Sequence, residues 1–461
     1  MNRSINDLTI GSPVRKILLF TLPLLAGNLF QQLYNMVDMM IVGTTINTNA
    51  LAAVGATGSV SFLVIGFAQG LTAGFSVITA QHYGAGEEEK VRRSVAVSLV
   101  LSVACAVFIT VLSILIAAPL LRIMQTPQDI FEDALSYLSV VCLGTTATVF
   151  FNLFSSILRA LGDSRTPLLF LIIACLLNIG LDFAFILGLS MGVAGAAWAT
   201  ILSQLVSALL CLFYSIKKFP ILRLKRADFQ ITRSLVSQHL SIGVAMGLQS
   251  SMTTISVLIF QVAVNQLGMV SVKAYSAAAK ICQLALQPMS SLGITMATYS
   301  AQNFGAQKIK RIRTGVRQGA FIAIAFALAG CLLVHLAGRS LIGLFGIGSE
   351  EIQVADQAQL YLSVTSSFYI LFGLWSVFRN ALQGMGYTRI PMLSAGLEIV
   401  LRIICSFGFT SFAGFLGISF VDPVTWAGAL ALLMTGYFAA IKKVTAFQRQ
   451  SANPDTEGQT P

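Results

Sequence analysis

Three acidic residues lie inside long apolar stretches of the sequence: Asp38, Asp182 and Glu398. An ionised side chain at the centre of a bilayer costs roughly 2.5–3.5 kcal/mol on insertion scales, so each acid needs a partner or a function. Burial disfavours the charged form of a carboxyl group, and a second carboxylate nearby disfavours it further. A buried pair of acids can therefore bind and release a proton near neutral pH. Carboxylate, amide and hydroxyl oxygens could equally coordinate a hard cation such as Na⁺.

Asp38 and Asp182 have no basic partner in their own apolar stretches. At 1.5 Å per helical residue, Asp38, Asp182 and Thr200 are predicted to lie about 8, 10 and 12 Å from the outer membrane surface. The polar residues that share a helical face with one of the acids are Asn28, Gln31 and Asn35 with Asp38, and Asn178 with Asp182. We therefore expect two carboxylates, an amide and a hydroxyl at one depth. The alternative is that these groups only bond neighbouring helices, which is the better interpretation for Thr200 taken alone.

The elements that must position these groups follow from the composition. The 461 residues are 56% hydrophobic and 10% charged, with a mean hydropathy of +0.81, which is typical of an integral membrane protein. Twelve apolar stretches reach the roughly 20 residues that cross a bilayer as a helix. They run over residues 16–43, 50–80, 94–118, 134–158, 166–188, 192–216, 236–264, 274–300, 315–338, 357–383, 390–412 and 423–443. The expected fold class is an all-α integral membrane protein, because lipid leaves backbone groups no partner outside a helix.

The basic residues indicate orientation rather than nucleic-acid binding. Most of the 29 Lys and Arg residues fall in the two termini and in alternate loops, which makes those the cytoplasmic side. The basic stretch 217–233 is expected to be a solvated linker, with a membrane-surface helix as the alternative. All seven cysteines fall inside apolar stretches without CxxC spacing, so we expect packing residues and neither disulfide nor metal.

The two halves of the chain repeat each other. AQHYGA at 80–85 recurs as AQNFGA at 301–306, and RALGDSRTP at 159–167 matches QGMGYTRIP at 383–391, with offsets of 221 and 224 residues. Two parallel six-helix bundles are therefore predicted, related by a pseudo-two-fold axis along the membrane normal, with a substrate path between them. The expected parts are a cytoplasmic N-terminus (1–15), an N-lobe (16–216), a linker (217–235), a C-lobe (236–443) and a cytoplasmic tail (444–461).

These repeated turns, together with LTIGSPVRKILLFTLPLLAGNLFQQLYNMVDMMIVG at 8–43, resemble the multidrug and toxin extrusion (MATE) family of secondary transporters, and within it the DinF-like branch. The resemblance covers nearly the whole chain. It implies a cation-coupling set formed by Asp38, Asn178, Asp182, Ala196 and Thr200, with Ala196 as a carbonyl ligand. It also implies a helix-bending role for Pro23. The seventh, eighth and tenth stretches carry no interior acid, so the carboxylates that the NorM-like branch has in its C-lobe are missing.

Other polar and aromatic residues are weaker candidates. The resemblance also implies that Gln31, Tyr34 and Asn152 lie at the substrate cavity, although a structural amide is an equal alternative for Asn152. Asn35, Met36 and Phe154 are further cavity candidates, although packing is favoured for the apolar residues. Glu398 and Arg402, four residues apart, are expected to form a structural ion pair. Lys280 is expected to extend its ammonium group towards the outer surface.

The expected function is therefore efflux of small amphipathic, often cationic compounds by H⁺ or Na⁺ antiport, with no cofactor other than the ion. The expected protein is a monomer in the bacterial plasma membrane, with the lipid bilayer and the small molecules as its partners. A lipid-linked oligosaccharide flippase of related fold is the alternative. An enzyme is not expected, because GLSMG at 188–192 lies in a predicted extracellular turn and the three histidines are scattered. The sequence has no Walker motif, so the expected energy source is an ion gradient.

Overall fold

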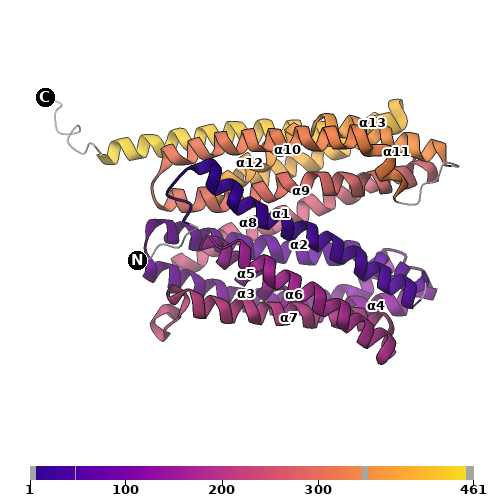
Figure 1. The fold of residues 1–461 in the computed structure, drawn as a ribbon, viewed down its shortest axis with the longest axis horizontal. Helices are drawn as coiled ribbons and strands as arrows, with labels where there is room; N and C mark the ends of the chain where they lie inside the picture. The colour runs from indigo at the N-terminus through magenta and orange to yellow at the C-terminus, as the bar shows by residue number, and fades with distance from the viewer. Residues whose placement is uncertain (1–6, 47, 345–350, 453–461) are drawn as a thin grey trace. The chain divides into compact units, whose positions relative to one another are not determined.

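The computed structural model describes residues 7–46, 48–344 and 351–452, and every regular element in these ranges is a helix. Figure 1 shows the long helices running side by side within each part of the chain. In chain order the elements are α1 (Pro13–Thr45), α2 (Thr48–Ala85), α3 (Glu88–Ile123), α4 (Gln128–Leu143), α5 (Thr145–Ala160), α6 (Arg165–Asp182), the π-helix η1 (Phe183–Gly188), α7 (Gly192–Lys218), the 3₁₀ turns η2 (Pro220–Leu222) and η3 (Arg226–Phe229), α8 (Arg233–Asn265), α9 (Met269–Gly305), α10 (Ile309–Gly343), α11 (Ile352–Ser367), α12 (Tyr369–Gly384) and α13 (Arg389–Ala452).

All twelve predicted spans fall on these helices, and several of the spans depart from a straight rod. Two are bent pairs, with angles of 43° between α4 and α5 and 50° between α11 and α12. The first bend is at Gly144, where an added Cβ would lie 2.1 Å from Cγ1 of Ile201. The last two spans are joined within α13 at Gly414, whose φ of +54° and ψ of −132° are not helical and favour glycine.

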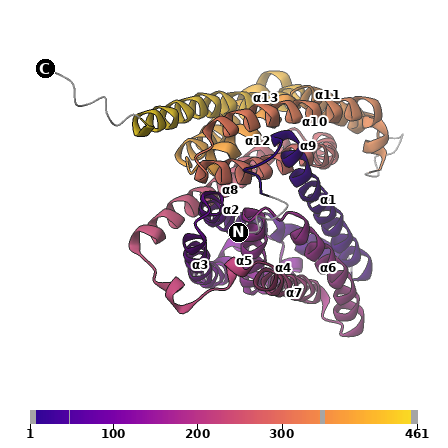
Figure 2. The ribbon, with the colours of Figure 1, turned by 60° about the vertical axis from the view of Figure 1, so that its left-hand side comes forward.

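The chain packs as two compact units. The first unit is Met1–Asp7 with Leu18–Gln261, and the second is Leu8–Ile17 with Val262–Pro461. Within the first unit α2 packs against α3, α4 and α5, and α7 packs against α4, α5 and α6. Figure 2 shows these helices more nearly end-on, as one bundle. Within the second unit α9 and α12 pack against each other and against α10, and α13 packs against α11 and α12.

The units differ from the predicted lobes at residues 8–17 and in α8. Most of α8 belongs to the first unit because it packs closely on α2. A Cβ built on Gly74 of α2 would lie 2.6 Å from Cα of Gly243 in α8. Small residues at four-residue steps let two helices approach in this way. The division into sequence repeats at the linker stays a prediction.

The N-terminal segment 8–11 is held by the turn between α9 and α10, within the second unit. The Leu8 N–H donates to Oε1 of Gln302 at 3.1 Å, and Nδ2 of Asn303 donates to the Leu8 carbonyl at 3.2 Å. Arg311 donates to the carbonyls of Leu8, Ile10 and Gly11 at 2.7–3.2 Å. The AQNFGA motif and the basic residue after it thus have a structural role, which is to fix the start of α1.

Replacing Arg311 by Gln should release this segment, because three backbone carbonyls lose a charged donor and such bonds contribute about 1.5–3 kcal/mol each at most. We expect amide hydrogen exchange at residues 8–11 to rise at least tenfold. The matched control is Lys310→Gln, which removes one positive charge from an exposed position on the same turn. Equal exchange in the two variants would contradict the role assigned to Arg311.

Candidate cation site

Four of the residues predicted for cation coupling meet within the first unit. Asp38 comes from α1, Asn178 and Asp182 from the last turns of α6, and Thr200 from α7. Asn178 and Asp182 are fully buried. The hydrogen-bonding pattern orients the Asn178 amide so that Nδ2 donates to Oδ2 of Asp182 at 2.8 Å and Oδ1 accepts from the Thr200 N–H at 3.0 Å. The amide therefore joins α6 to α7 and fixes the carboxyl group of Asp182.

The Thr200 hydroxyl connects the site to α1. It donates to the Ala196 carbonyl at 3.1 Å and lies 3.3 Å from the Tyr34 hydroxyl, which is then the donor to Thr200. Ala196, predicted as a carbonyl ligand, contributes here by orienting the hydroxyl. Tyr34, predicted as a cavity residue, lies near the carboxyl pair through this contact with Thr200.

Asp38 and Asp182 lie close enough together for their side chains to interact. Two carboxyl groups this close can share a hydrogen bond only when one of them carries a proton. Oδ1 of each residue is buried and has no hydrogen-bond partner in the described part of the chain. None of the ion pairs found among the described residues involves either acid. The site thus presents unsatisfied carboxyl oxygens, which suit a proton or a small cation.

A buried apolar cluster lies on the helices that carry the carboxyl pair. One polar residue that packs against it was not predicted from the sequence. Ile41, Ile186 and Val193 form part of a buried cluster against which Tyr137 of α4 packs. Tyr137 lies close enough to interact electrostatically with both Asp38 and Asp182. The sequence signal was weak, because the predicted span of Tyr137 carries no charged residue.

The helix that carries Asp182 changes its winding directly after that residue. Phe183–Gly188 form a π-helix, η1, which continues α6 without a loop. The wider turn changes the direction of the side chains that follow, and π-helical turns are frequent at functional sites. Helical periodicity in the sequence contains no sign of this change.

The other predicted cavity residues do not join the carboxyl pair. Gln31 donates to Asn35 at 3.4 Å on an exposed face of α1, where Met36 is also exposed. Asn152 donates to the carbonyl of Thr148 at 2.8 Å, a bond within its own helix. Phe154 is buried in the core formed by α3, α5, α6 and α7 and stacks on Phe150. Pro23 lies inside α1, as predicted, and its role in bending stays a prediction.

The ion pair between Glu398 and Arg402 stays a prediction, and both residues have other partners. Arg402 forms its described ion pair with Asp422, at 2.8 Å between Nη2 and Oδ1. Glu398 accepts hydrogen bonds from Nε1 of Trp375 at 2.9 Å and from the Ser394 hydroxyl at 3.4 Å. The four-residue rule considers one helix at a time, whereas this Arg reaches across the break at Gly414.

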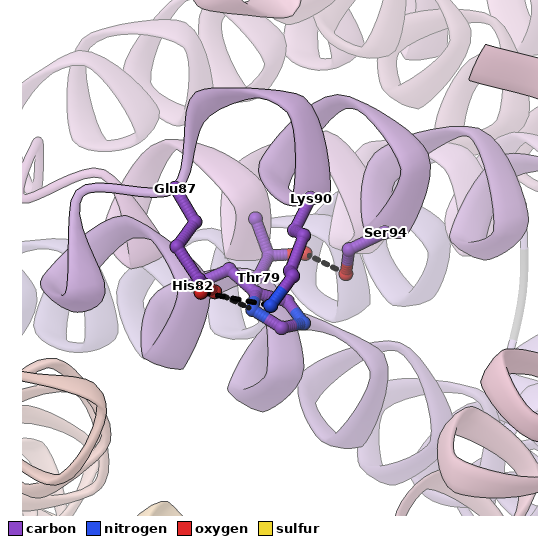
Figure 3. Close-up of polar contacts among 5 residues, drawn as sticks. All are labelled: Thr79, His82, Glu87, Lys90 and Ser94. Carbon is purple, nitrogen blue, oxygen red and sulfur yellow. Dashed lines mark hydrogen bonds and ion pairs between the residues drawn. The ribbon is translucent and has the colours of Figure 1, made fainter. Parts of the chain in front are cut away.

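The AQHYGA turn lies between α2 and α3 and holds a second polar cluster, away from the carboxyl pair (Figure 3). Nδ1 of His82 and Nζ of Lys90 contact the two oxygens of Glu87 at 2.9 and 2.8 Å. The hydrogen bond from Lys90, and then the bond with His82, lower the pKa of Glu87. In the same view Thr79 and Ser94 are bonded at 2.9 Å, and Ser94 continues to Nε2 of His239 on α8 at 3.0 Å. These contacts join α2, α3 and α8 and need no catalytic interpretation.

Comparison with known proteins identifies the family of this chain. A family model described as MatE matches residues 23–184 and 242–407. The chain belongs to the MATE family. The probable multidrug resistance protein YoeA of Bacillus subtilis is 26% identical over 441 residues, covering 93% of this chain and 94% of the relative. YpnP of the same organism, also named a probable multidrug resistance protein, is 28% identical over 82% of this chain and 84% of its own.

Solved structures show the MATE fold. A transporter from Pyrococcus furiosus, whose structure is titled as having a binding pocket of reverse polarity, superposes with a TM-score of 0.90 at 24% identity over 96% of this chain and all of its own. A structure titled as an outward-facing multidrug resistance MATE transporter gives 0.89 at 23% identity, over 96% of this chain and 99% of its own. The chain is thus a multi-pass membrane transporter with twelve spans in two bundles. Assignment to the DinF-like branch stays a prediction.

Proposed function

We propose that this MATE protein is a secondary active multidrug exporter that exchanges H⁺ or Na⁺ for its substrate at the Asp38–Asp182 pair. The observation that carries the proposal is the contact between these two carboxyl groups, each with a buried Oδ1 that lacks a partner in the described chain. A buried acid pair with unsatisfied oxygens is unfavourable unless it binds a cation or a proton. Binding of a cation or a proton would therefore satisfy these oxygens, which in an ordinary structural pair already have partners.

Loading changes the charge of the site, and this is how it would drive transport. A proton shared by the two acids, or Na⁺ bound by their free oxygens, reduces the negative charge near the outer side of the membrane. A cationic substrate is attracted to the same charge, so the ion and the substrate compete for it. Antiport with alternating access follows when each state of the cycle can hold only one of them.

The substrate class rests on the relatives and on composition. Curated relatives are named multidrug resistance or multidrug export proteins, including MepA of Staphylococcus aureus at 21% identity over 88% of this chain. Small amphipathic compounds, often cationic, suit a chain with an interior acid pair. The excess of Lys and Arg in alternate loops favours a plasma-membrane protein with both termini cytoplasmic.

Purified protein in proteoliposomes separates the two coupling ions. We expect uptake of a cationic dye, such as ethidium, to follow either a pH gradient alone or a Na⁺ gradient alone. The gradient should raise the initial rate at least tenfold over vesicles without one. A rate that neither gradient changes would reject antiport, and dye movement that requires ATP would reject a secondary transporter.

A further inference from the structure

The second unit contains a buried polar cluster that the proposed coupling site does not use. Nη2 of Arg402 pairs with Oδ1 of Asp422 at 2.8 Å, and the Tyr361 hydroxyl donates to Oδ2 of the same carboxylate at 2.7 Å. The ring of Tyr275 stands edge-on to that of Tyr361, with centroids 5.4 Å apart. Arg402 is only 8% exposed and Tyr361 2%. A charged pair this deep in a membrane protein is costly and calls for an explanation.

The helices show that this cluster is the second copy of the cation site. Adding the repeat offset of 224 to α4, α5 and the start of α6 gives α11 (Ile352–Ser367), α12 (Tyr369–Gly384) and the start of α13 at Arg389. The same offset carries Tyr137 onto Tyr361 and Asn178 onto Arg402.

A glycine extends the match to the third helix. Gly192 and Gly414 both have positive φ, +58° and +54°, and each introduces the next helical segment of its repeat. Thr200 lies eight residues after the first glycine and Asp422 eight residues after the second. Three members of the first site, a tyrosine, an amide and a hydroxyl, thus correspond to a tyrosine, a guanidinium and a carboxylate in the second.

The two copies differ in how their carboxyl oxygens are satisfied. In the first, Oδ1 of Asp38 and Oδ1 of Asp182 have no partner in the described chain. In the second, the guanidinium pairs with one oxygen of Asp422 and the Tyr361 hydroxyl donates a hydrogen bond to the other. Guanidinium is permanently charged and keeps its place as a fixed cation. Asp182 itself corresponds to the fully buried Ser406, so the second copy has no acid pair.

We infer that Arg402 is a built-in cation that fills the second copy of the site and closes it to H⁺ and Na⁺. The transporter therefore takes its coupling ion through the first unit alone. This inference rests on the proposed function, because it identifies the first copy as the one that loads a mobile cation. Arg402 thus determines which half of the duplicated fold is coupled to the ion.

Removing the fixed cation should open the second copy. The variant Arg402→Gln leaves Asp422 with Tyr361 as its polar partner, and a mobile cation then has a carboxylate to bind. The titratable groups around Asp422 are Tyr361 on α11, Tyr275 and Cys282 on α9, Tyr369 on α12 and Arg402 on α13. The tyrosines and the cysteine are neutral at physiological pH, so Asp422 is the group among them that a cation would reach.

The test measures the thermal midpoint of purified protein, with Na⁺ exchanged for choline and with pH varied, in the background of Asp182→Asn, which removes the first site. In that background we expect no cation-linked shift. Adding Arg402→Gln should create one, a rise of a few degrees with Na⁺ or on acidification. Adding Asp422→Asn as well should abolish it. Absence of the shift in Asp182→Asn/Arg402→Gln, or its persistence without Asp422, would overturn the inference.

Two further measurements keep the outcomes separate. If Arg402→Gln does not accumulate, Arg402→Lys is measured in the same background. Lys keeps the positive charge and should show no cation-linked shift, so a shift there overturns the inference. The unmodified protein tests the proposed function by itself. If it shows no cation-linked shift that Asp182→Asn removes, the proposed coupling role of the first site is rejected. The response of Asp422 to loss of Arg402 is still measured independently.

Discussion

Replacing Asp182 by Asn should reduce cation-driven efflux to background while the protein still folds and reaches the membrane. The new amide has the shape of the carboxyl group, and Asp182 is fully buried, so packing changes little. The negative charge is lost, however, and with it one of the two oxygens available to a cation. We expect cation affinity to fall at least about tenfold, or about 1.4 kcal/mol. The measurement is dye efflux from cells and gradient-driven uptake in proteoliposomes, with the amount of protein determined in parallel.

Asp38→Asn should have the same effect, because the two acids interact closely and belong to one proposed site. The matched control is Asp356→Asn, which also changes an acid to its amide. Asp356 pairs with Arg339 at 2.6 Å, but both side chains are more than half exposed, and such surface pairs contribute about 0–1 kcal/mol. The control should transport at the normal rate. Normal efflux in both Asp38→Asn and Asp182→Asn would reject the coupling role of the pair.

Much of this site was predictable because lipid makes the sequence unusually informative. An acid in an apolar stretch is rare, and counting residues from the ends of the stretches was enough to place Asp38, Asp182 and Thr200 at similar depth. The role of Tyr34 was not predictable, because a tyrosine in a membrane span usually reports only the interface. Tyr137 and the π-helix after Asp182 depend on how α4 and α6 bend, and hydropathy does not encode bends.

For the fold as well, features set by a span's own residues were predictable, and features set by contacts between distant residues were not. Hydropathy predicted all twelve spans, since each needs only its own residues to be apolar. It did not predict how the last two spans meet, which is at a kink where the backbone angles of Gly414 are not helical. It also missed the partner of Arg402. Asp422 is twenty residues away and lies outside the predicted spans, so a rule for neighbours on one helix could not select it.

The grouping of α8 with the first unit has a physical cause that a substitution can test. Gly70 and Gly74 of α2 face Gly247 and Gly243 of α8 with no space for side chains. A Cβ on Gly70 would lie 2.5 Å from the Met246 carbonyl oxygen, and one on Gly74 would lie 2.6 Å from Cα of Gly243. Both contacts are with backbone, which cannot rotate away as a flexible side chain can. A larger residue must therefore separate the two helices.

Gly74→Val should accordingly lower the free energy of unfolding by about 1–3 kcal/mol or more, the range for overpacked cores. Gly74→Ala should give a smaller loss in the same direction, since its single methyl group already meets backbone. The matched control is Gly55→Val in the same helix, where an added Cβ has no atom within 4 Å. Thermal unfolding of the purified variants measures the difference. Equal losses at the two positions would mean that valine acts through helix propensity, whereas a loss confined to Gly74 means that close approach of α2 and α8 stabilises the first unit.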